Sequence, residues 1–319
     1  MGVYFSSAKK ILPHFLKLFG KATYKQKRVF ALISLLIPAL GILAIVLVYP
    51  VIWSFYLSFR DYNFLQGTLV NRFVGFRNYV SIFTKPSPIA IVSFARVIYQ
   101  TFTYAAGITA VSFLLAFGFA LLTTKVSRGA RAFQTIITIP MMMIPAATIL
   151  IWRAFLYNQT FGWINIVLDA LGLEKQLFLG STEWSLYAVM MVDIWQWTPF
   201  LFLFLLAGLR ALPPALFEAA AIDGASSWQK FIHLTLPLLR PIILIILCLK
   251  FIDTFRAFDY VYLLTGGGPV GSSEILSTYI YRLAFGNTLF GQGASMSVLM
   301  FLLLLPITVL FVRLIFRRG

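Results

Sequence analysis

Long uncharged runs of apolar residues recur along this chain and predict membrane-spanning helices. A helix needs roughly 20 mostly apolar residues to cross the hydrocarbon core of a bilayer. Six runs are long enough: 29–59, 97–124, 132–152, 184–209, 238–264 and 295–312. The fourth carries one charge, Asp193, and the fifth is interrupted by four charged residues. We therefore expect an all-α integral membrane protein with about six transmembrane helices in a permease-sized domain over 29–319.

Composition supports lipid as the solvent of this chain. Of the 319 residues, 60% are hydrophobic and only 11% are charged, whereas soluble domains carry near a quarter charged residues. The single cysteine, Cys248, excludes an intrachain disulfide and a cysteine-based metal cluster. His14 and His233 have no ligand-like spacing, so we expect no metal site. Neither a Ser–His–Asp nor a Cys–His arrangement is apparent, which argues against an enzyme.

The net charge of +16 reports topology because the cations lie between the apolar runs. Cytoplasmic loops carry an excess of Lys and Arg. The leader before the first run has seven, and the second-to-third connection, the fourth-to-fifth connection and the tail have three each, against eight in the opposite loops. This bias predicts that both termini are cytoplasmic. The cations form no single basic face, so a nucleic-acid partner is not expected.

Residues 1–28 form a basic leader with two open interpretations. Ile11, Phe15, Leu18 and Phe19 recur at helical spacing beside lysines, which suits a helix on the inner membrane surface. A frayed basic leader explains the same residues. The apolar run that follows is too long for a signal peptide and no small-residue cleavage site follows it, so it is read as a retained first span.

The connection 210–237, between the fourth and fifth runs, predicts a short helix–turn–helix in the cytoplasm. Pro213 and Pro214 suit the first turn of a helix, and 215–222 is a strong helix former. Gly224 permits the chain to stop and turn. Ser226 is a candidate cap, with Ser227, for a second short helix.

This connection resembles the cytoplasmic EAA loop of the permease subunits of binding-protein-dependent ABC importers. That loop reads Glu-Ala-Ala, three residues, Gly, nine residues, Ile, one residue, Leu-Pro. The matching positions here are Glu218, Ala219, Ala220, Gly224, Leu234, Leu236 and Pro237. Every interval matches, and the one departure is Leu234 for Ile, a nearly volume-neutral change.

The resemblance implies the permease fold of the maltose and methionine importers, with a coupling helix seated in a cleft of a cytoplasmic ATPase. Glu218 would make the charged contact, Ala219 and Ala220 would allow close approach, and Gly224 would set the turn. The full set of implied coupling residues is Glu218, Ala219, Ala220, Asp223, Gly224, Leu234 and Pro237. ATP and Mg would be bound by the partner, since the nearest trace of a phosphate loop here, Gly20-Lys21, lacks the rest of the motif.

The resemblance also implies partners and a location. An ATPase dimer offers two clefts and this chain has one loop, so the resemblance implies a second, related permease chain and therefore a heterodimer. An extracytoplasmic solute-binding protein completes the importer. The expected location is the cytoplasmic or inner membrane of a bacterium or archaeon.

Further matches in order along the chain resemble the carbohydrate-uptake branch, the maltose- and glycerol-phosphate-type permeases. They are Tyr49-Pro50, Gly75 with Asn78-Tyr79, Gly162 to Asn165, Phe258 to Pro269, and Tyr281 to Phe285. The solute implied is a sugar or oligosaccharide, with a sugar acid or glycerol phosphate included.

Charged and aromatic residues inside the runs are candidates for the substrate path. They are Asp193, Trp195, Gln196, Trp197, Lys250, Asp253, Arg256 and Asp259. The last four recur at steps of three, so on one helix they would lie near one another with alternating sign. They would either stiffen the helix as an ion-pair ladder or line the path, because ionisable residues in a span face a cavity or another helix. The tryptophans either stack on sugars or anchor the helix at the interface.

Three rival functions stay open. A permease for an amino acid, polyamine or phosphate shares the coupling loop, and its cognate binding protein would bind such a solute. A channel or ion-driven carrier would transport without an ATPase. A structural scaffold would show no dependence on solute and leaves the loop spacing unexplained.

Overall fold

The computed structural model describes residues 24–65, 68–84, 92–126 and 128–316. Most of the predicted leader, including Gly20-Lys21, lies outside these residues. The described elements are α2 (Tyr24–Leu43), η1 (Ala44–Val48), α3 (Tyr49–Ser58), β1 (Arg60–Leu65), β2 (Thr68–Phe73), α4 (Arg77–Thr84), α5 (Phe94–Lys125), α6 (Ala130–Met142), α7 (Pro145–Ile151), η2 (Trp152–Leu156), α8 (Trp163–Ala170), α9 (Ser185–Arg210), α10 (Pro214–Ile222), α11 (Ser227–Lys230), η3 (Phe231–Thr235), α12 (Leu236–Phe255), α13 (Asp259–Leu264), α14 (Leu276–Tyr281), η4 (Arg282–Gly286) and α15 (Phe290–Phe316). The η elements are single π-helical turns. The helical membrane fold expected from the sequence is therefore confirmed.

The chain divides into two compact units, 1–56 and 57–319. In the first, α2, η1 and most of α3 form one continuous apolar helix, and none of the side chains described between 33 and 56 is buried. The rings of Tyr49, Trp53 and Tyr56 stack in succession, with centroids 6.2 and 5.0 Å apart. A helix this apolar and this exposed is suited to lipid or to a partner helix and not to water.

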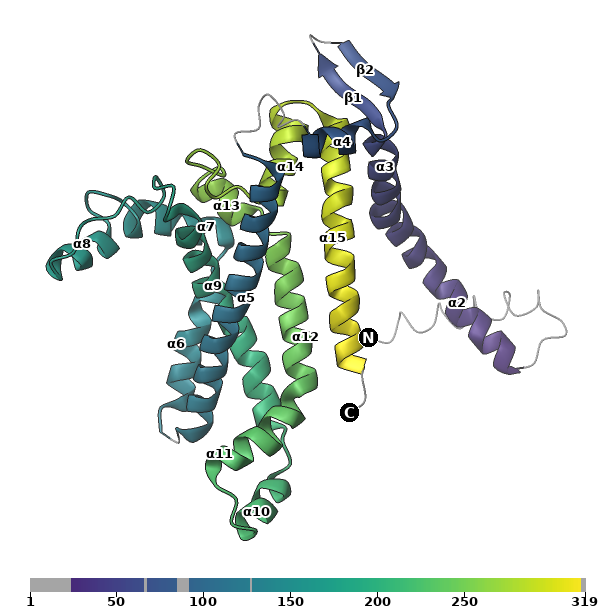
Figure 1. Cartoon of the computed structure of the whole chain (residues 1–319). Coiled ribbons are helices and arrows are strands. Elements are labelled where there is room, and N and C mark those ends of the chain that lie inside the picture. The colour runs from purple at the N-terminus through teal and green to yellow at the C-terminus, as the bar shows by residue number, and fades with distance from the viewer. Residues whose placement is uncertain (1–23, 66–67, 85–91, 127, 317–319) are drawn as a thin grey trace, which may run out of the picture. The chain divides into compact units, whose positions relative to one another are not determined.

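The second unit is built around four long helices, α5, α9, α12 and α15, which run side by side (Figure 1). The most extensive packing joins α5 to α9. Toward their α10 end the helices bury a cluster that includes Leu201, Leu205, Leu239 and Ile246. At Gly208 a Cβ atom would lie 2.8 Å from Ile242 Cδ1, so a glycine there lets α9 and α12 approach closely.

The third predicted span, 132–152, is bent. The axes of α6 and of the helix formed by α7 and η2 differ by 95°, across a break at Met143 and Ile144. Pro145 is the cause, because it disfavours helical conformation in the preceding residue, and Ile144 is extended. The described residues thus hold five helices long and apolar enough to span, and a sixth candidate in this broken pair.

The fifth predicted span is shorter than expected. Helix α12 ends at Phe255, and α13 begins only at Asp259, so the prediction of one helix through residue 264 was wrong. The intervening Arg256-Ala257-Phe258 contains no glycine or proline. A tertiary contact satisfies the interrupted backbone instead, since the Ser277 hydroxyl donates a hydrogen bond to the Ala257 carbonyl oxygen.

At the end of the second unit opposite α10, the chain forms structures that helical periodicity did not predict. Strands β1 and β2 pair as an antiparallel hairpin, with Arg60 opposite Phe73 (Figure 1). Asn78 in α4 donates from Nδ2 to the Ser58 and Arg60 carbonyl oxygens at 2.9 and 2.8 Å, which ties the helix to the chain entering the hairpin. Asn165 similarly donates to the Gln176 carbonyl at 3.1 Å and accepts from its N–H at 2.9 Å. Two residues of the family-like motifs are therefore loop anchors.

Candidate functional site

The first candidate site is the α10–α11 hairpin (residues 214–230), which local capping makes rigid. Pro214 occupies the first turn of α10. A Schellman motif closes that helix: the Gly224 N–H donates to the Ala221 carbonyl at 3.1 Å, and the Ala225 N–H to the Ala220 carbonyl at 2.9 Å. Gly224 has φ +78°, the left-handed conformation that glycine adopts without strain.

A capping box then starts α11. The Gln229 N–H donates to Ser226 Oγ at 3.3 Å, and the Ser226 N–H donates to Gln229 Oε1 at 2.7 Å. The helix–turn–helix predicted from the prolines, the glycine and the serine is confirmed.

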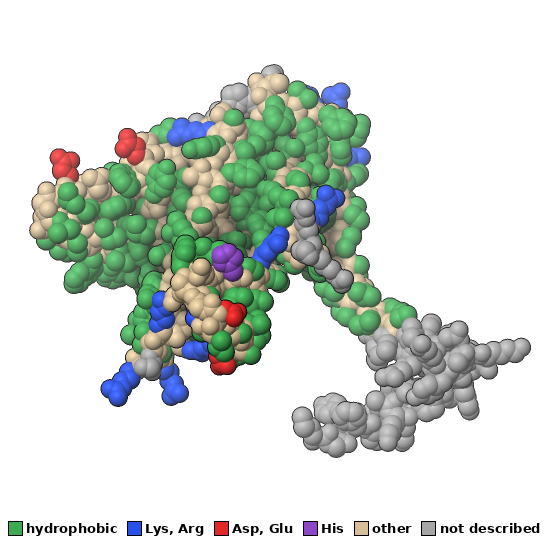
Figure 2. All heavy atoms as spheres, turned by 60° about the horizontal axis from the view of Figure 1, so that its bottom comes forward, with side chains coloured by type: hydrophobic (Ala, Val, Ile, Leu, Met, Phe, Trp, Pro, Cys, Tyr) green, Lys and Arg blue, Asp and Glu red, His purple; other side chains and the backbone are tan. Residues whose placement is uncertain are grey.

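The hairpin presents most of its side chains to the surroundings, while Phe217 and Ala220 are half-buried. Neither α10 nor α11 contains a buried residue among those described. Ile222 is 88% exposed and Trp228 is 67% exposed, so the hairpin offers apolar contact area as well as polar groups. Figure 2 shows this end of the molecule, where charged side chains gather on the projecting tip among apolar ones.

The predicted coupling residues take distinct positions along this segment. Glu218 and Ala219 are exposed on α10, and Glu218 borders a groove of about 500 Å³ beneath that helix. Asp223 is the residue after α10, and its N–H donates to the Ala219 carbonyl at 3.0 Å. Leu234 lies in η3 and Pro237 in the first turn of α12. The spaced motif therefore spans the hairpin and the turn that leads from it into α12.

The second candidate site is a polar cluster buried between α5, α9 and α12. We define the polar cluster as Tyr104, Asp193, Gln196, Trp197, Lys250 and Tyr260. Lys250 Nζ lies 2.7 Å from Asp193 Oδ1, and both side chains are 2% exposed. The Tyr104 hydroxyl donates to Asp193 Oδ2 at 3.0 Å. A lone charge buried there would cost several kcal/mol, and the partner charge with its added hydrogen bond offsets much of that cost.

Three further members of the polar cluster form a second chain of hydrogen bonds. The Tyr260 hydroxyl donates to Gln196 Oε1 at 2.7 Å and accepts from Trp197 Nε1 at 2.8 Å. Gln196 Nε2 in turn donates to the Met143 carbonyl at 2.8 Å, at the break between α6 and α7. Lys250 Nζ also lies 5.6 Å from the centre of the Trp197 ring, in cation–π range.

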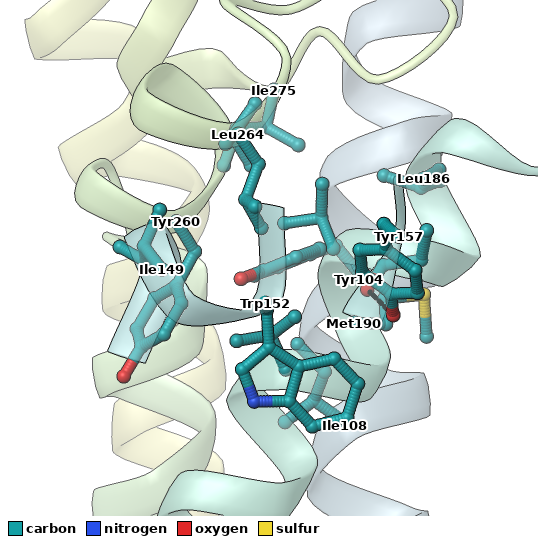
Figure 3. Packing of buried hydrophobic residues seen from close by; sticks show 14 residues of the cluster. Tyr104, Ile108, Ile149, Trp152, Tyr157, Leu186, Met190, Tyr260, Leu264 and Ile275 are labelled. Carbon is teal, nitrogen blue, oxygen red and sulfur yellow. Dashed lines mark hydrogen bonds between the residues drawn. The ribbon is translucent and has the colours of Figure 1, made fainter. Parts of the chain in front are cut away.

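Apolar side chains pack against one side of the polar cluster. Tyr104 and Tyr260 belong to a buried cluster that also contains Ile108, Ile149 and Trp152 (Figure 3). In such surroundings each hydrogen bond is electrostatically stronger than in water. The polar cluster therefore fixes α9 against α12 and α13 at a defined register.

A cavity of about 370 Å³ opens beside the polar cluster. Its wall is formed by Pro145, Asp193, Trp197, Asp253, Arg256, Ala257, Phe258, Asp259 and Tyr260. Five of the eight residues predicted for a substrate path therefore meet at one cavity. Aromatic rings and charged groups share its surface, which is the composition of a site for a polar organic molecule.

The other three predicted path residues lie elsewhere. Lys250 is held behind the wall by Asp193, and Gln196 is buried, positioning Tyr260. Trp195 is 39% exposed and packs edge-on against Trp152, with ring centroids 5.6 Å apart, so it is not a cavity residue.

The predicted four-residue ladder on one helix was wrong. The shorter ion pair of Lys250, at 2.7 Å, is with Asp193 on α9, whereas Asp253 on its own helix lies 3.8 Å away. Arg256 caps the end of α12 and Asp259 starts α13, so the four residues do not share a helix. The helix break turns the last two into cavity residues.

Sequence patterns missed the tyrosines of the polar cluster. Tyr260 lies within the family-like segment that begins at Phe258, which was a usable signal. Tyr104 sits 89 residues from Asp193 along the chain, and its uncharged, apolar surroundings carry no local sign of that partner.

A third polar arrangement organises the glycine-rich segment after α13. Glu274 is buried, and Arg282 Nη2 lies 2.5 Å from its Oε2 while also donating to the Gly266 carbonyl at 2.8 Å. Burial raises the pKa of Glu274, and the Arg282 charge opposes that rise. A Cβ on Gly267 would lie 2.6 Å from Glu274 Oε2, so this glycine makes room for the ion pair.

Within the described ranges, no group of three His, Cys, Asp or Glu residues could hold a metal ion.

Comparison with known proteins identifies relatives of this chain. Residues 113–318 match the family model described as binding-protein-dependent transport system inner membrane component. The chain is 33% identical to the trehalose/maltose transport system permease protein MalF of Thermococcus litoralis over 94% of this chain and 98% of that protein. It is 32% identical to the sulfoquinovosyl glycerol transport system permease protein SmoG of Agrobacterium fabrum, with 89% of each chain covered.

A solved structure agrees with both. A bacterial alginate ABC transporter, in complex with an alginate pentasaccharide-bound periplasmic protein, contains a chain that is 26% identical with a TM-score of 0.74. The match covers 89% of this chain and 93% of that one.

Proposed function

This chain belongs to the family of binding-protein-dependent transport system inner membrane components, and from that premise we propose that it is the membrane-spanning subunit of an ATP-driven importer for a sugar or oligosaccharide. A binding protein delivers the solute, and alternating access carries it into the cytoplasm.

One structural observation carries the proposal. The α10–α11 hairpin is inserted between α9 and α12, and these same two helices hold Asp193 and Lys250. Movement of the hairpin therefore acts on both helices, and on the cavity beside them, without an intervening flexible linker. Transporters move rigid helical bundles about a central site in this manner.

The hairpin suits a partner that hydrolyses ATP. Glu218 is exposed, and the salt bridges among the described side chains do not include it. Ile222, one turn further along α10, and Trp228 on α11 are also exposed, so the hairpin combines a charge with apolar contact area. We propose that an ATPase subunit covers this surface and supplies ATP and Mg, and that a second, related permease engages the other subunit of an ATPase dimer.

The distribution of cations supports an orientation. Lys125, Arg128, Arg131 and Arg210 are all exposed, at the ends of α5, α6 and α9 that adjoin the hairpin. Excess Lys and Arg marks the cytoplasmic side. We therefore assign the hairpin to the cytoplasm and the β1–β2 end to the opposite side of an inner or cytoplasmic membrane. The seven cations of the leader and the three of the tail support cytoplasmic termini as well.

Relatives support a sugar as the solute. The two relatives are named for a trehalose/maltose and a sulfoquinovosyl glycerol transport system, and the related structure is that of an alginate ABC transporter. The cavity fits such molecules, because Trp197, Phe258 and Tyr260 offer apolar ring surface while Asp253 and Arg256 accept and donate hydrogen bonds. These relatives include one named for neutral disaccharides and one for an acidic polysaccharide, so they leave the charge of the solute open.

The test uses the complete importer in membrane vesicles. Glu218→Arg reverses the charge at the proposed contact and is expected to abolish solute-stimulated ATP hydrolysis while the chain stays in the membrane. Glu183→Arg is the matched control, since Glu183 is also an exposed glutamate but lies just before the other end of α9.

Unchanged solute-stimulated ATP hydrolysis in Glu218→Arg would show that the hairpin does not couple ATP hydrolysis to transport. Solute transport by the purified chain alone would instead favour a channel or ion-driven carrier.

A further inference from the structure

We infer that the cavity beside the polar cluster selects uncharged sugars and disfavours anionic ones such as sugar acids and sugar phosphates. The inference rests on the proposed function, because it concerns the solute that passes this cavity. It begins with the charges that the wall presents.

Lys250 of the polar cluster is not available to an anionic solute. Its side chain is 2% exposed, and its Nζ lies 2.7 Å from Oδ1 of Asp193, whose side chain is also 2% exposed. Tyr104 donates a further hydrogen bond to the same carboxylate. The pair is internally neutral, and detaching Lys250 to meet a solute would leave the Asp193 charge buried and without its partner.

Besides Asp193, the charged groups that line the cavity are two acids and one base, and one of the acids, Asp253, lies 3.8 Å from Lys250. The Asp253 side chain is 56% exposed, and Arg256 and Asp259 are also exposed. All three line the cavity. With the Asp193–Lys250 pair neutral, the wall carries one unmatched negative charge.

The remaining wall is suited to a neutral ring. Trp197, Phe258 and Tyr260 contribute aromatic surface, and Pro145 and Ala257 contribute apolar surface. The Tyr260 hydroxyl is already engaged by Gln196 and Trp197, so it holds its ring in place. Sugar hydroxyls can donate to the two carboxylates, whereas a solute carboxylate or phosphate has no proton to donate.

The electrostatic effect is large enough to measure. A unit charge about 6 Å from Asp253, at an effective dielectric constant between those of water and a protein surface, changes binding by roughly tenfold. Removing one wall charge should therefore shift the preference between charged and neutral solutes by several fold.

The experiment compares matched sugars in cells that carry the complete importer as their only route for disaccharide uptake. Cells receive an equimolar mixture of maltose, cellobiose and diacetylchitobiose together with the aldonic acid made from each by oxidation of its reducing end. Accumulated sugars are measured by mass spectrometry. We expect the neutral forms to exceed their acids by about tenfold or more.

Three variants assign this preference to the cavity. Asp253→Asn should raise the acid-to-neutral ratio several fold, and Arg256→Gln should lower it by a similar factor. Asp169→Asn removes an exposed aspartate on α8, outside the cavity wall, and should leave the ratio unchanged. Every variant uses the same binding protein, so comparing their ratios with that of the unmodified chain cancels the binding protein's own preference.

The outcomes separate this inference from the function beneath it. Equal uptake of acids and neutral sugars, or a ratio that neither cavity variant changes, would overturn the charge selection while sugar import stood. Accumulation of no sugar in the mixture would overturn the assignment of a sugar solute and the inference with it.

Discussion

The α10–α11 hairpin and the polar cluster are joined to the same two helices, α9 and α12, yet they are held in place by opposite means. The hairpin is organised by bonds between residues at most five positions apart and has no buried side chain among those described. The Asp193–Lys250 pair joins residues 57 positions apart and is 2% exposed. Local hydrogen bonds therefore shape a surface that a partner can bind, while long-range bonds hold together the interior helices that the hairpin would move.

This difference predicts unequal costs of mutation. A change in the polar cluster leaves a buried charge without its partner, which should lower the free energy of unfolding of the packed helices. A change in the hairpin destabilises one helical turn locally, and its main effect should be on the coupling of ATP hydrolysis to transport. The predictions below test this contrast in order of expected size.

The largest effect is expected from Lys250→Met. It removes the ammonium but leaves the Asp193 carboxylate buried, which should lower the free energy of unfolding by about 3–5 kcal/mol. Unfolding of the purified chain in mixed micelles measures it.

Two controls accompany that variant. Lys175→Met breaks an ion pair of 3.5 Å to Asp169 whose side chains are 44% and 66% exposed, so its cost should stay under about 1 kcal/mol. Adding Asp193→Leu to Lys250→Met removes both charges and should restore most of the lost stability. Equal costs for the two lysine variants would erase the distinction between interior and surface.

Tyr104→Phe should have the next largest effect on stability. It deletes only the hydroxyl that donates to Asp193, and a hydrogen bond to a buried charged group contributes about 1.5–3 kcal/mol. Tyr187→Phe, at a tyrosine that is 54% exposed, is the control and should change little in the same unfolding measurement. A Tyr104→Phe cost no greater than that of the control would mean that the carboxylate is satisfied without this bond.

The two regions also differ in how far sequence alone revealed them. The hairpin was predictable because its determinants are local: Pro214 starts a helix, Gly224 ends it and Ser226 starts the next. The residue types of the polar cluster stood out inside apolar runs, but their partners did not. One interpretation paired Lys250 along its own helix, where Asp253 does lie 3.8 Å away, but only packing of α9 against α12 reveals Asp193 as the closer partner.

The helix breaks show the same contrast. The bend before α7 follows from Pro145, which the sequence displays. The end of α12 at Phe255 is stabilised by Ser277, 20 residues beyond Ala257, through a contact that no local pattern encodes. Two of the cavity residues, Arg256 and Asp259, owe their positions to this second kind of break.

In the hairpin, Gly224→Ala should cost about 1–2 kcal/mol locally, the penalty for an L residue in the left-handed conformation. A Cβ there would meet nothing within 4 Å, so the cost is purely conformational. In this variant, hydrogen exchange of the backbone amides of residue 224 and of Ala225 should accelerate about 5- to 30-fold. Solute-stimulated ATP hydrolysis by the importer should fall.

Gly172→Ala is the matched control for that variant. Gly172 has φ +73°, and its Cβ would also meet nothing within 4 Å, but it follows α8. It should suffer the same local loosening with no loss of coupling. A fall in ATP hydrolysis in both variants would attribute the effect to general instability and not to the hairpin.

The smallest effect is expected from Ser226→Ala, which removes the hydroxyl that accepts from the Gln229 N–H. Loss of such a cap costs about 1 kcal/mol, so exchange of the Gln229 amide should quicken roughly fivefold while global unfolding hardly changes. Ser226→Thr keeps an accepting hydroxyl and should retain slow exchange. If Ser226→Ala lowered global stability as much as Tyr104→Phe, the hairpin would be part of the cooperative interior, and the contrast between the two regions would be wrong.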